Sequence, residues 1–197
     1  MSAVYSPTWY DDTCALPSWQ PSSVIQKKNF DFCIIGGGLA GLSCAYHLAE
    51  IGAKVALCEH SEIGAGASGR NGGFCSSGWA AGLDQITRLV GPLVSKELEL
   101  IGADGFKWMR DRAFSSKYTK AQPISGIISL GLKGQISEGS NRLDEVELKK
   151  FVDGPRYKWG KIDNEAFHFH PLNFLKTFLR KLILKIIGPI WKTHFIW

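Results

Sequence analysis

The sequence lacks the features that would assign it to a membrane or secreted protein. It has no stretch of about 18 consecutive apolar residues, so no transmembrane helix is predicted. Its first 29 residues have neither the basic start nor the continuous apolar segment of a signal peptide. We therefore expect a cytoplasmic protein without membrane association.

Cysteine is scarce and follows no recognisable pattern. The five cysteines form no Cys-x-x-Cys pair, and their spacing to the five histidines matches no zinc motif. His168 and His170 lack a third ligand nearby, so we interpret them as structural and expect no metal. An odd number of cysteines without a disulfide framework suits a reducing compartment. We interpret the cysteines, and Cys33, Cys44 and Cys58 in particular, as small buried apolar residues.

A basic surface spread over the whole chain is also missing. The net charge of +5 arises from 23 basic and 18 acidic residues. Residues 171–197 hold five basic residues and no acidic one, so the rest of the chain is neutral. A nucleic-acid-binding domain usually carries a basic face, so we exclude nucleic acid as a partner. The basic segment 171–197 is amphipathic, and we interpret it as a core-packing helix rather than one lying on a membrane.

The chain does contain a clear alternation of short apolar strands and helices. At 197 residues and 45% hydrophobic, it is long enough for one ordinary domain with a core. Strand Phe30–Ile35, helix Leu39–Ile51 and strand Lys54–Cys58 predict a right-handed βαβ unit with parallel strands. Beyond it the patterns predict a loop at His60–Gly82, a helix at Pro92–Phe114, a strand at Ile124–Leu132, a short helix at Asn141–Lys150 and a helix from Pro171 to a stop at Gly188.

Three glycines at the first turn of this unit form the motif Gly-x-Gly-x-x-Gly. Gly36 allows the tight turn after the strand, Gly38 lets a pyrophosphate approach the backbone, and Gly41 lets the helix pack closely on the sheet. Glu59 ends the next strand, roughly 20 residues on, where a carboxylate binds ribose hydroxyls. Strand, helix and acid together predict a dinucleotide site, with phosphate at the helix N-terminus.

The loop after Glu59 helps to distinguish between FAD and NAD as the dinucleotide. Its stretch Ile63–Gly73 reads IGAGASGRNGG, in which backbone amides can close on a phosphate and Ser68 and Arg70 can donate hydrogen bonds to it. An NAD-dependent dehydrogenase with the same glycine motif finds no support after Glu59 and is the less favoured alternative.

These residues resemble the FAD-dependent amine and amino-acid oxidases of the D-amino-acid oxidase superfamily, in particular its gamma-glutamylputrescine oxidase-like branch. The similarity lies in FDFCIIGGGLAGLSCAYHLAEIGAKVALCEH and IGAGASGRNGG, and more loosely in FHFHPLNFLKTFLRKL. It implies FAD as cofactor, a small amine or amino acid as substrate, hydride transfer to the flavin and reoxidation by dioxygen. The implied cofactor-binding residues are Gly36, Gly38, Leu39, Ala40, Gly41, Glu59, His60, Ala67, Ser68, Arg70, Asn71 and Gly72.

The expected fold class is α/β: a Rossmann-like FAD-binding βαβ unit with a parallel sheet, plus the start of a mixed α+β substrate domain. The ranges we predict are an irregular arm at 1–29, the FAD-binding portion at 30–120, the start of the substrate region at 121–170, and an amphipathic helix with a divergent tail at 171–197.

The chain departs from the family in length. Members of this kind are roughly twice as long, which exceeds the usual size of one domain, and their second glycine-rich segment has no counterpart here. We therefore expect an incomplete fold and hypothesise a truncated or frameshifted product. The alternatives are a non-catalytic remnant and a subunit that needs a second chain. No catalytic residue is nominated, although Tyr157 and Asn71 are candidates by position.

Overall fold

The computed structural model describes residues 6–18, 29–132, 141–187 and 193–196. The chain forms two compact units, the first made of Met1–Gly73, Ala113–Gln122 and Phe169–Trp197, the second of Phe74–Arg112 and Pro123–His168. These units interleave along the chain, because the second is largely inserted into the first. The consecutive ranges 30–120 and 121–170 predicted from the sequence therefore do not coincide with them.

The first unit contains a three-stranded parallel sheet in the order β1 (Phe32–Ile35), β2 (Val55–Cys58), β7 (Thr193–Ile196). Phe32 is level with Val55, and Val55 in turn with Thr193. The predicted βαβ unit is confirmed. The tail after the last helix, described from the sequence only as divergent, contains strand β7, whose backbone pairs with the free edge of β2. Its sequence THFI is rich in the β-branched and aromatic residues that favour strands.

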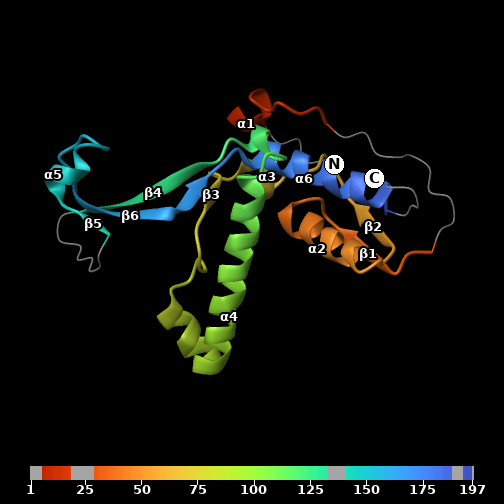
Figure 1. Cartoon of the computed structure of the whole chain (residues 1–197), viewed down its shortest axis with the longest axis horizontal. Coiled ribbons are helices and arrows are strands. Elements are labelled where there is room, and N and C mark those ends of the chain that lie inside the picture. The colour runs from red at the N-terminus through yellow and green to blue at the C-terminus, as the bar shows by residue number, and fades with distance from the viewer. Residues whose placement is uncertain (1–5, 19–28, 133–140, 188–192, 197) are drawn as a thin grey trace. The chain divides into compact units, whose positions relative to one another are not determined.

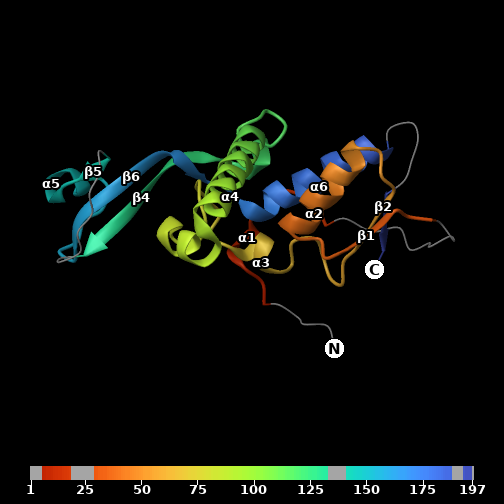
Figure 2. The same cartoon turned by 90° about the horizontal axis from the view of Figure 1, so that it is seen from below.

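Two helices beside this sheet provide the core of the first unit. Helix α2 (Leu39–Glu50) connects β1 to β2 and is followed by Gly52, whose φ of 84° is the left-handed conformation that favours glycine at a helix end. Helix α6 (Pro171–Ile187) lies beside α2 in both views (Figures 1 and 2). Phe174, Phe178 and Leu182 of α6 are buried, which confirms it as a core-packing helix. Its predicted stop, Gly188, lies outside the described residues.

The N-terminal arm, here residues 6–18, is more ordered than the irregular lead-in we predicted. It contains one helical turn, α1 (Trp9–Asp12), because Thr8 and Asp11 form a reciprocal capping box. The Trp9 and Tyr10 rings lie 5.7 and 5.1 Å from the His170 ring, measured between centroids. Two further short elements belong to this unit, α3 (Ala67–Arg70) within the predicted loop and the 3₁₀ turn η1 (Thr119–Ala121).

The second unit is built on an antiparallel sheet in the order β3 (Phe74–Cys75), β6 (Tyr157–His168), β4 (Ile124–Leu132), with β5 (Arg142–Leu143) also paired to β6. Strand β4 has the predicted bounds. The helix expected over Asn141–Lys150 is limited to α5 (Glu145–Leu148), because Asp144 accepts hydrogen bonds from the first N–H groups and starts the helix there.

Helix α4 (Leu83–Ala113) begins earlier than predicted and is broken at Gly91, whose φ of 82° and ψ of 165° are not helical. The predicted helix corresponds to the segment that starts at Pro92, a residue suited to the first helical position. None of the helices in the described part of the chain is long and apolar enough to cross a membrane.

The expectation that the cysteines are buried was wrong, since none of the five is fully buried. Cys33 and Cys44 are exposed, and Cys14, Cys58 and Cys75 are partly buried.

Candidate functional site

The turn between β1 and α2 can be formed only with small residues. Gly36 has a φ of 103°, and its N–H donates to the Cys58 carbonyl over 2.7 Å, which ties the turn to the end of β2. A side chain at Gly41 would place its Cβ 1.9 Å from the Gly36 oxygen, and one at Gly38 would lie 2.8 Å from Ser68 Oγ. Gly36 and Gly41 therefore occupy positions that require glycine, whereas a side chain at Gly38 would displace the Ser68 hydroxyl.

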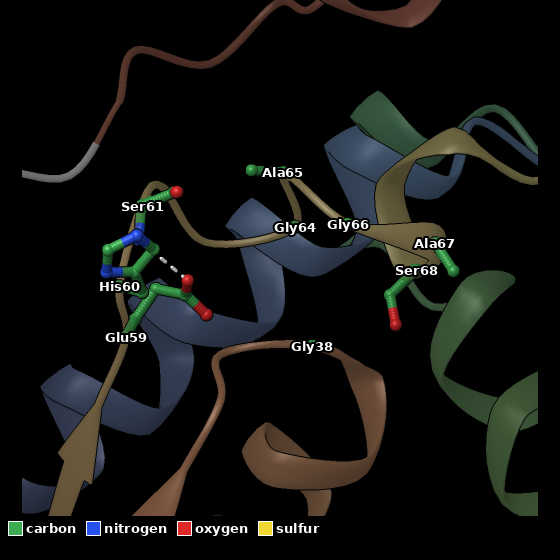
Figure 3. Close-up of a pocket in the computed structure, with 9 residues that line it drawn as sticks. All are labelled: Gly38, Glu59, His60, Ser61, Gly64, Ala65, Gly66, Ala67 and Ser68. Carbon is green, nitrogen blue, oxygen red and sulfur yellow. Dashed lines mark hydrogen bonds between the residues drawn. The ribbon is translucent and has the colours of Figure 1, made fainter. Parts of the chain in front are cut away.

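A pocket of about 240 Å³ opens beside this turn, at the carboxyl ends of β1 and β2 (Figure 3). This is the edge of a parallel sheet where ligands usually bind. Three segments of the first unit supply its lining: the start of α2, the end of β2 and the small-residue loop. The residues are Gly38, Glu59, His60, Ser61, Gly64, Ala65, Gly66, Ala67 and Ser68.

Backbone N–H groups hold the Glu59 carboxylate in place at the end of β2. Its Oε2 accepts from the Gly37 N–H over 2.5 Å, and its Oε1 accepts from the Ser61 N–H over 2.8 Å (Figure 3 shows the second bond). The carboxylate is therefore fixed at the pocket wall by donors on both sides. Its oxygens can still accept further hydrogen bonds, because each carboxylate oxygen has two lone pairs.

The N-terminus of α2 faces the loop that closes the pocket. Ser68 Oγ accepts a hydrogen bond from the N–H of Leu39, the first residue of α2, over 3.0 Å. The first N–H groups of a helix lack partners within the helix and carry the positive end of its dipole. An oxygen atom at this place shows that the geometry suits an acceptor, and an anionic group would be stabilised more strongly.

The structure brings five predicted residues together in the pocket lining: Gly38, Glu59, His60, Ala67 and Ser68. Gly36, Leu39, Ala40 and Gly41 lie in the adjoining turn and the first turn of α2 without lining it. Sequence reasoning did not nominate Ser61, Gly64, Ala65 or Gly66. The signal for three of them was available, because they belong to the small-residue loop from which the other ligands were chosen.

Three predicted residues lie away from the pocket lining. The Arg70 guanidinium donates to the Ser6 carbonyl over 2.5 Å and lies 3.8 Å from the Asp11 carboxylate. Asn71 braces its own loop, since its amide donates to the Ala67 and Ser68 carbonyls and accepts from the Gly73 N–H. Gly72 is exposed. Direct contact of these residues with a cofactor remains a prediction.

Comparison with known proteins places this site in a family. Residues 31–185 match the family model described as FAD dependent oxidoreductase (DAO). The chain is 31% identical to the gamma-glutamylputrescine oxidoreductase of Escherichia coli over 157 residues, which cover 73% of this chain and 37% of that protein. It is 27% identical to a probable oxidoreductase, OrdL, of Haemophilus influenzae, over 76% of this chain and 38% of that protein.

A solved structure with a similar fold is the L-amino acid deaminase of Proteus myxofaciens in complex with anthranilate. It superposes with a TM-score of 0.62 at 16% identity, over 92% of this chain and 41% of that one. The chain thus spans 37–41% of the length of these three proteins, in keeping with an incomplete fold. The family match covers most of this chain, its glycine turn and its acidic strand end, and the chain belongs to the DAO family of FAD-dependent oxidoreductases.

Proposed function

We propose that this chain supplies the ADP-binding part of an FAD-dependent oxidoreductase that oxidises the C–N bond of a small amine or amino acid. The observation that carries the proposal is the pocket at the N-terminus of α2, formed by Gly38, Glu59 and Ser68 in a chain of this family. When bound, FAD would accept hydride from the carbon that bears the nitrogen and be reoxidised by dioxygen.

The residues present fit the ADP portion of FAD. Gly38 leaves space for a pyrophosphate against the backbone, because a Cβ there would fill the gap to Ser68. The Ser68 hydroxyl and the first N–H groups of α2 would hold the phosphate charge. Glu59, fixed by two backbone donors, would accept from the ribose hydroxyls. A pocket of about 240 Å³ is small beside the roughly 300–1,000 Å³ of complete ligand sites, in keeping with a site for part of the cofactor.

The substrate class rests on the relatives. One is named a gamma-glutamylputrescine oxidoreductase and another a glycine oxidase, which favours a substrate with an amino group. We assign no catalytic residue. Tyr157 lies in β6 of the second unit, and Asn71 is engaged in its loop.

A second candidate is a subunit without activity of its own that requires another chain. The edge strand β1 supports it, because its Ile35 is 90% exposed and its Phe32 is 48% exposed. An NAD-dependent dehydrogenase loses support, because the family match is to FAD-dependent enzymes.

The test is titration of the purified chain with FAD. Binding is monitored by the quenching of flavin fluorescence and by the visible absorbance of the bound flavin. We expect the wild-type chain to bind FAD and Gly38→Ala to bind it at least about tenfold more weakly, because the new methyl group would enter the phosphate position. The matched control is Gly154→Ala, where an added Cβ meets nothing within 4 Å. A folded wild-type chain that neither quenches nor binds FAD would overturn the proposal.

With FAD bound, consumption of a panel of small amines and amino acids separates the two candidates. Turnover by this chain alone supports the oxidoreductase. The subunit hypothesis is supported if the chain binds FAD without turnover and turnover appears once a polypeptide with the remaining part of a relative is added.

A further inference from the structure

The N-terminal arm, residues 6–18, lies outside the part of the chain that matches the family model, yet it is firmly attached to the first unit. Figures 1 and 2 both show its helical turn α1 beside the start of α6. Its contacts fall into two groups: one to α6, which belongs to the core, and one to the loop that closes the pocket.

Hydrogen bonds to two buried residues of α6, and to His170 directly before it, anchor the arm. They join the Thr13 hydroxyl to His170 Nε2 (3.1 Å), the Ala15 N–H to Asn173 Oδ1 (2.9 Å) and Lys176 Nζ to the Leu16 carbonyl (3.3 Å). His170, Asn173 and Lys176 are each less than one-tenth exposed. Because α6 carries much of the core of this unit, these bonds give the arm a rigid base.

A second group of contacts joins the arm to both ends of the segment 62–70. At one end, the Ser18 hydroxyl donates to the Glu62 carboxylate over 2.6 Å. At the other, Arg70 donates to the Ser6 carbonyl and faces the Asp11 carboxylate. The middle of this segment, Gly64 to Ser68, lines the nucleotide pocket. The arm thus holds both ends of the loop whose centre forms the pocket wall.

These contacts are separate polar ties rather than a packed interface. A cavity of about 350 Å³ lies beside them, and its lining includes Asp11 and Arg70, along with Glu62 and Lys176. The backbone N–H and hydroxyl of Thr8 both donate to Asp11, and these bonds, with Arg70 and Lys176 nearby, lower the pKa of its carboxyl group. Asp11 is therefore ionised at neutral pH and available to Arg70.

We propose that the arm is a strap that holds segment 62–70 in its ligand-binding arrangement, with Asp11 and Ser18 as positioning residues. Neither of them lines the nucleotide pocket. The proposal rests on the proposed function only in treating that pocket as the cofactor site. It follows that FAD affinity depends on residues that do not touch FAD.

The test compares amide hydrogen exchange in the full-length chain and two variants, all without ligand. The variant Asp11→Asn/Ser18→Ala removes the negative charge and the hydroxyl, while the new amide oxygen can still cap Thr8. The control is Asp12→Asn, one residue along the same helical turn, whose carboxylate has no interaction among those described for this part of the chain. We expect exchange in 62–70 to rise about fivefold in the double variant and to stay unchanged in the control.

Unchanged exchange in 62–70, or an equal rise in α2, β2 and the second unit, would overturn the strap, because the arm would then have no local role or only a general stabilising one. The same variants are titrated with FAD, and we expect the double variant to bind it several-fold more weakly than Asp12→Asn. Faster exchange in 62–70 in a chain that binds no FAD would keep the strap and reject the proposed function. Normal FAD binding with faster exchange would reject the link between strap and cofactor.

Discussion

At the scale of single residues, His170 shows how one residue can connect two parts of the first unit, helix α6 and the N-terminal arm. Its carbonyl accepts from the Phe174 N–H at the start of α6, and its Nδ1 accepts from the Asn173 N–H over 3.1 Å. Nδ1 therefore carries a lone pair, which places the proton of the neutral ring on Nε2, the atom facing Thr13 of the arm. The sequence suggested only that His170 is not a metal ligand, and the structure gives it a capping role.

This arrangement predicts a pH dependence of stability. Burial lowers the pKa of His170 below its usual 6.5, because the protonated ring is poorly hydrated inside the protein. Protonation would also remove the Nδ1 acceptor and place a positive charge at the N-terminus of α6. The unfolded chain then binds this proton at a higher pH than the folded chain. The stabilisation is complete above about pH 6.5 and is lost as the pH falls through the folded pKa, with a limiting slope of about 1.4 kcal/mol per pH unit.

Urea unfolding between pH 7.5 and 5 measures this effect. In His170→Asn, an amide oxygen can still cap the helix but does not titrate in this range. We therefore expect the slope of the unfolding free energy against pH to fall by up to about 1.4 kcal/mol per pH unit, which corresponds to one proton. Equal slopes in the wild-type chain and in His170→Asn would contradict the capping role of His170.

At the scale of elements, the break in α4 depends on one glycine. Gly91 has a φ of 82° and a ψ of 165°, a region of backbone space that is accessible almost only to glycine. We expect Gly91→Ala to lower the free energy of unfolding by about 1–3 kcal/mol. Gly105 lies in the same helix, where an added Cβ meets nothing within 4 Å, so Gly105→Ala should instead raise it by up to about 1 kcal/mol. Denaturant unfolding of both variants checks the opposite signs, and a neutral Gly91→Ala would argue against the break.

The elements also show what a sequence can and cannot predict. The βαβ unit was predictable because local signals agree: an apolar run, a glycine turn, a helical period and a terminal acid. Strand β4 was recognised by its apolar, β-branched sequence. Strand β6 mixes glycine, lysine and tryptophan, so its period is hidden, and its pairing with β4 depends on residues some 30 positions away. β7 was missed for the same reason, since it exists through pairing with β2.

The site was predictable to the extent that it is local. Gly38 and Glu59 were found because they lie at the start of a helix and the end of a strand, and Ser68 because it lies in the small-residue loop that follows. The position of Arg70 was not, because it depends on Ser6 and Asp11, which approach from the N-terminal arm. The sequence contains no pattern that would indicate contact between Arg70 and these distant partners.

At the scale of the whole molecule, the open edge of the parallel sheet is the feature with the largest consequence. Parallel sheets are normally covered on both faces, and an unpaired edge is a template for association. In the described part of the chain no strand pairs with the outer side of β1. Ile35 and Phe32 are large apolar residues that this edge leaves exposed. We expect this exposed edge to pair with a strand or an apolar surface of another chain.

We therefore expect the isolated wild-type chain to self-associate in a concentration-dependent way, measurable by light scattering and sedimentation velocity. Ile35→Lys should reduce this association, because a charge on an edge strand opposes pairing with another strand. Ile51→Lys is the control, since Ile51 is 78% exposed but follows α2 rather than lying on β1. Equal association of the two variants would show that general apolar exposure drives the process. A monodisperse wild-type chain would show that the β1 edge is tolerated in solution, which would weaken the case for a second chain.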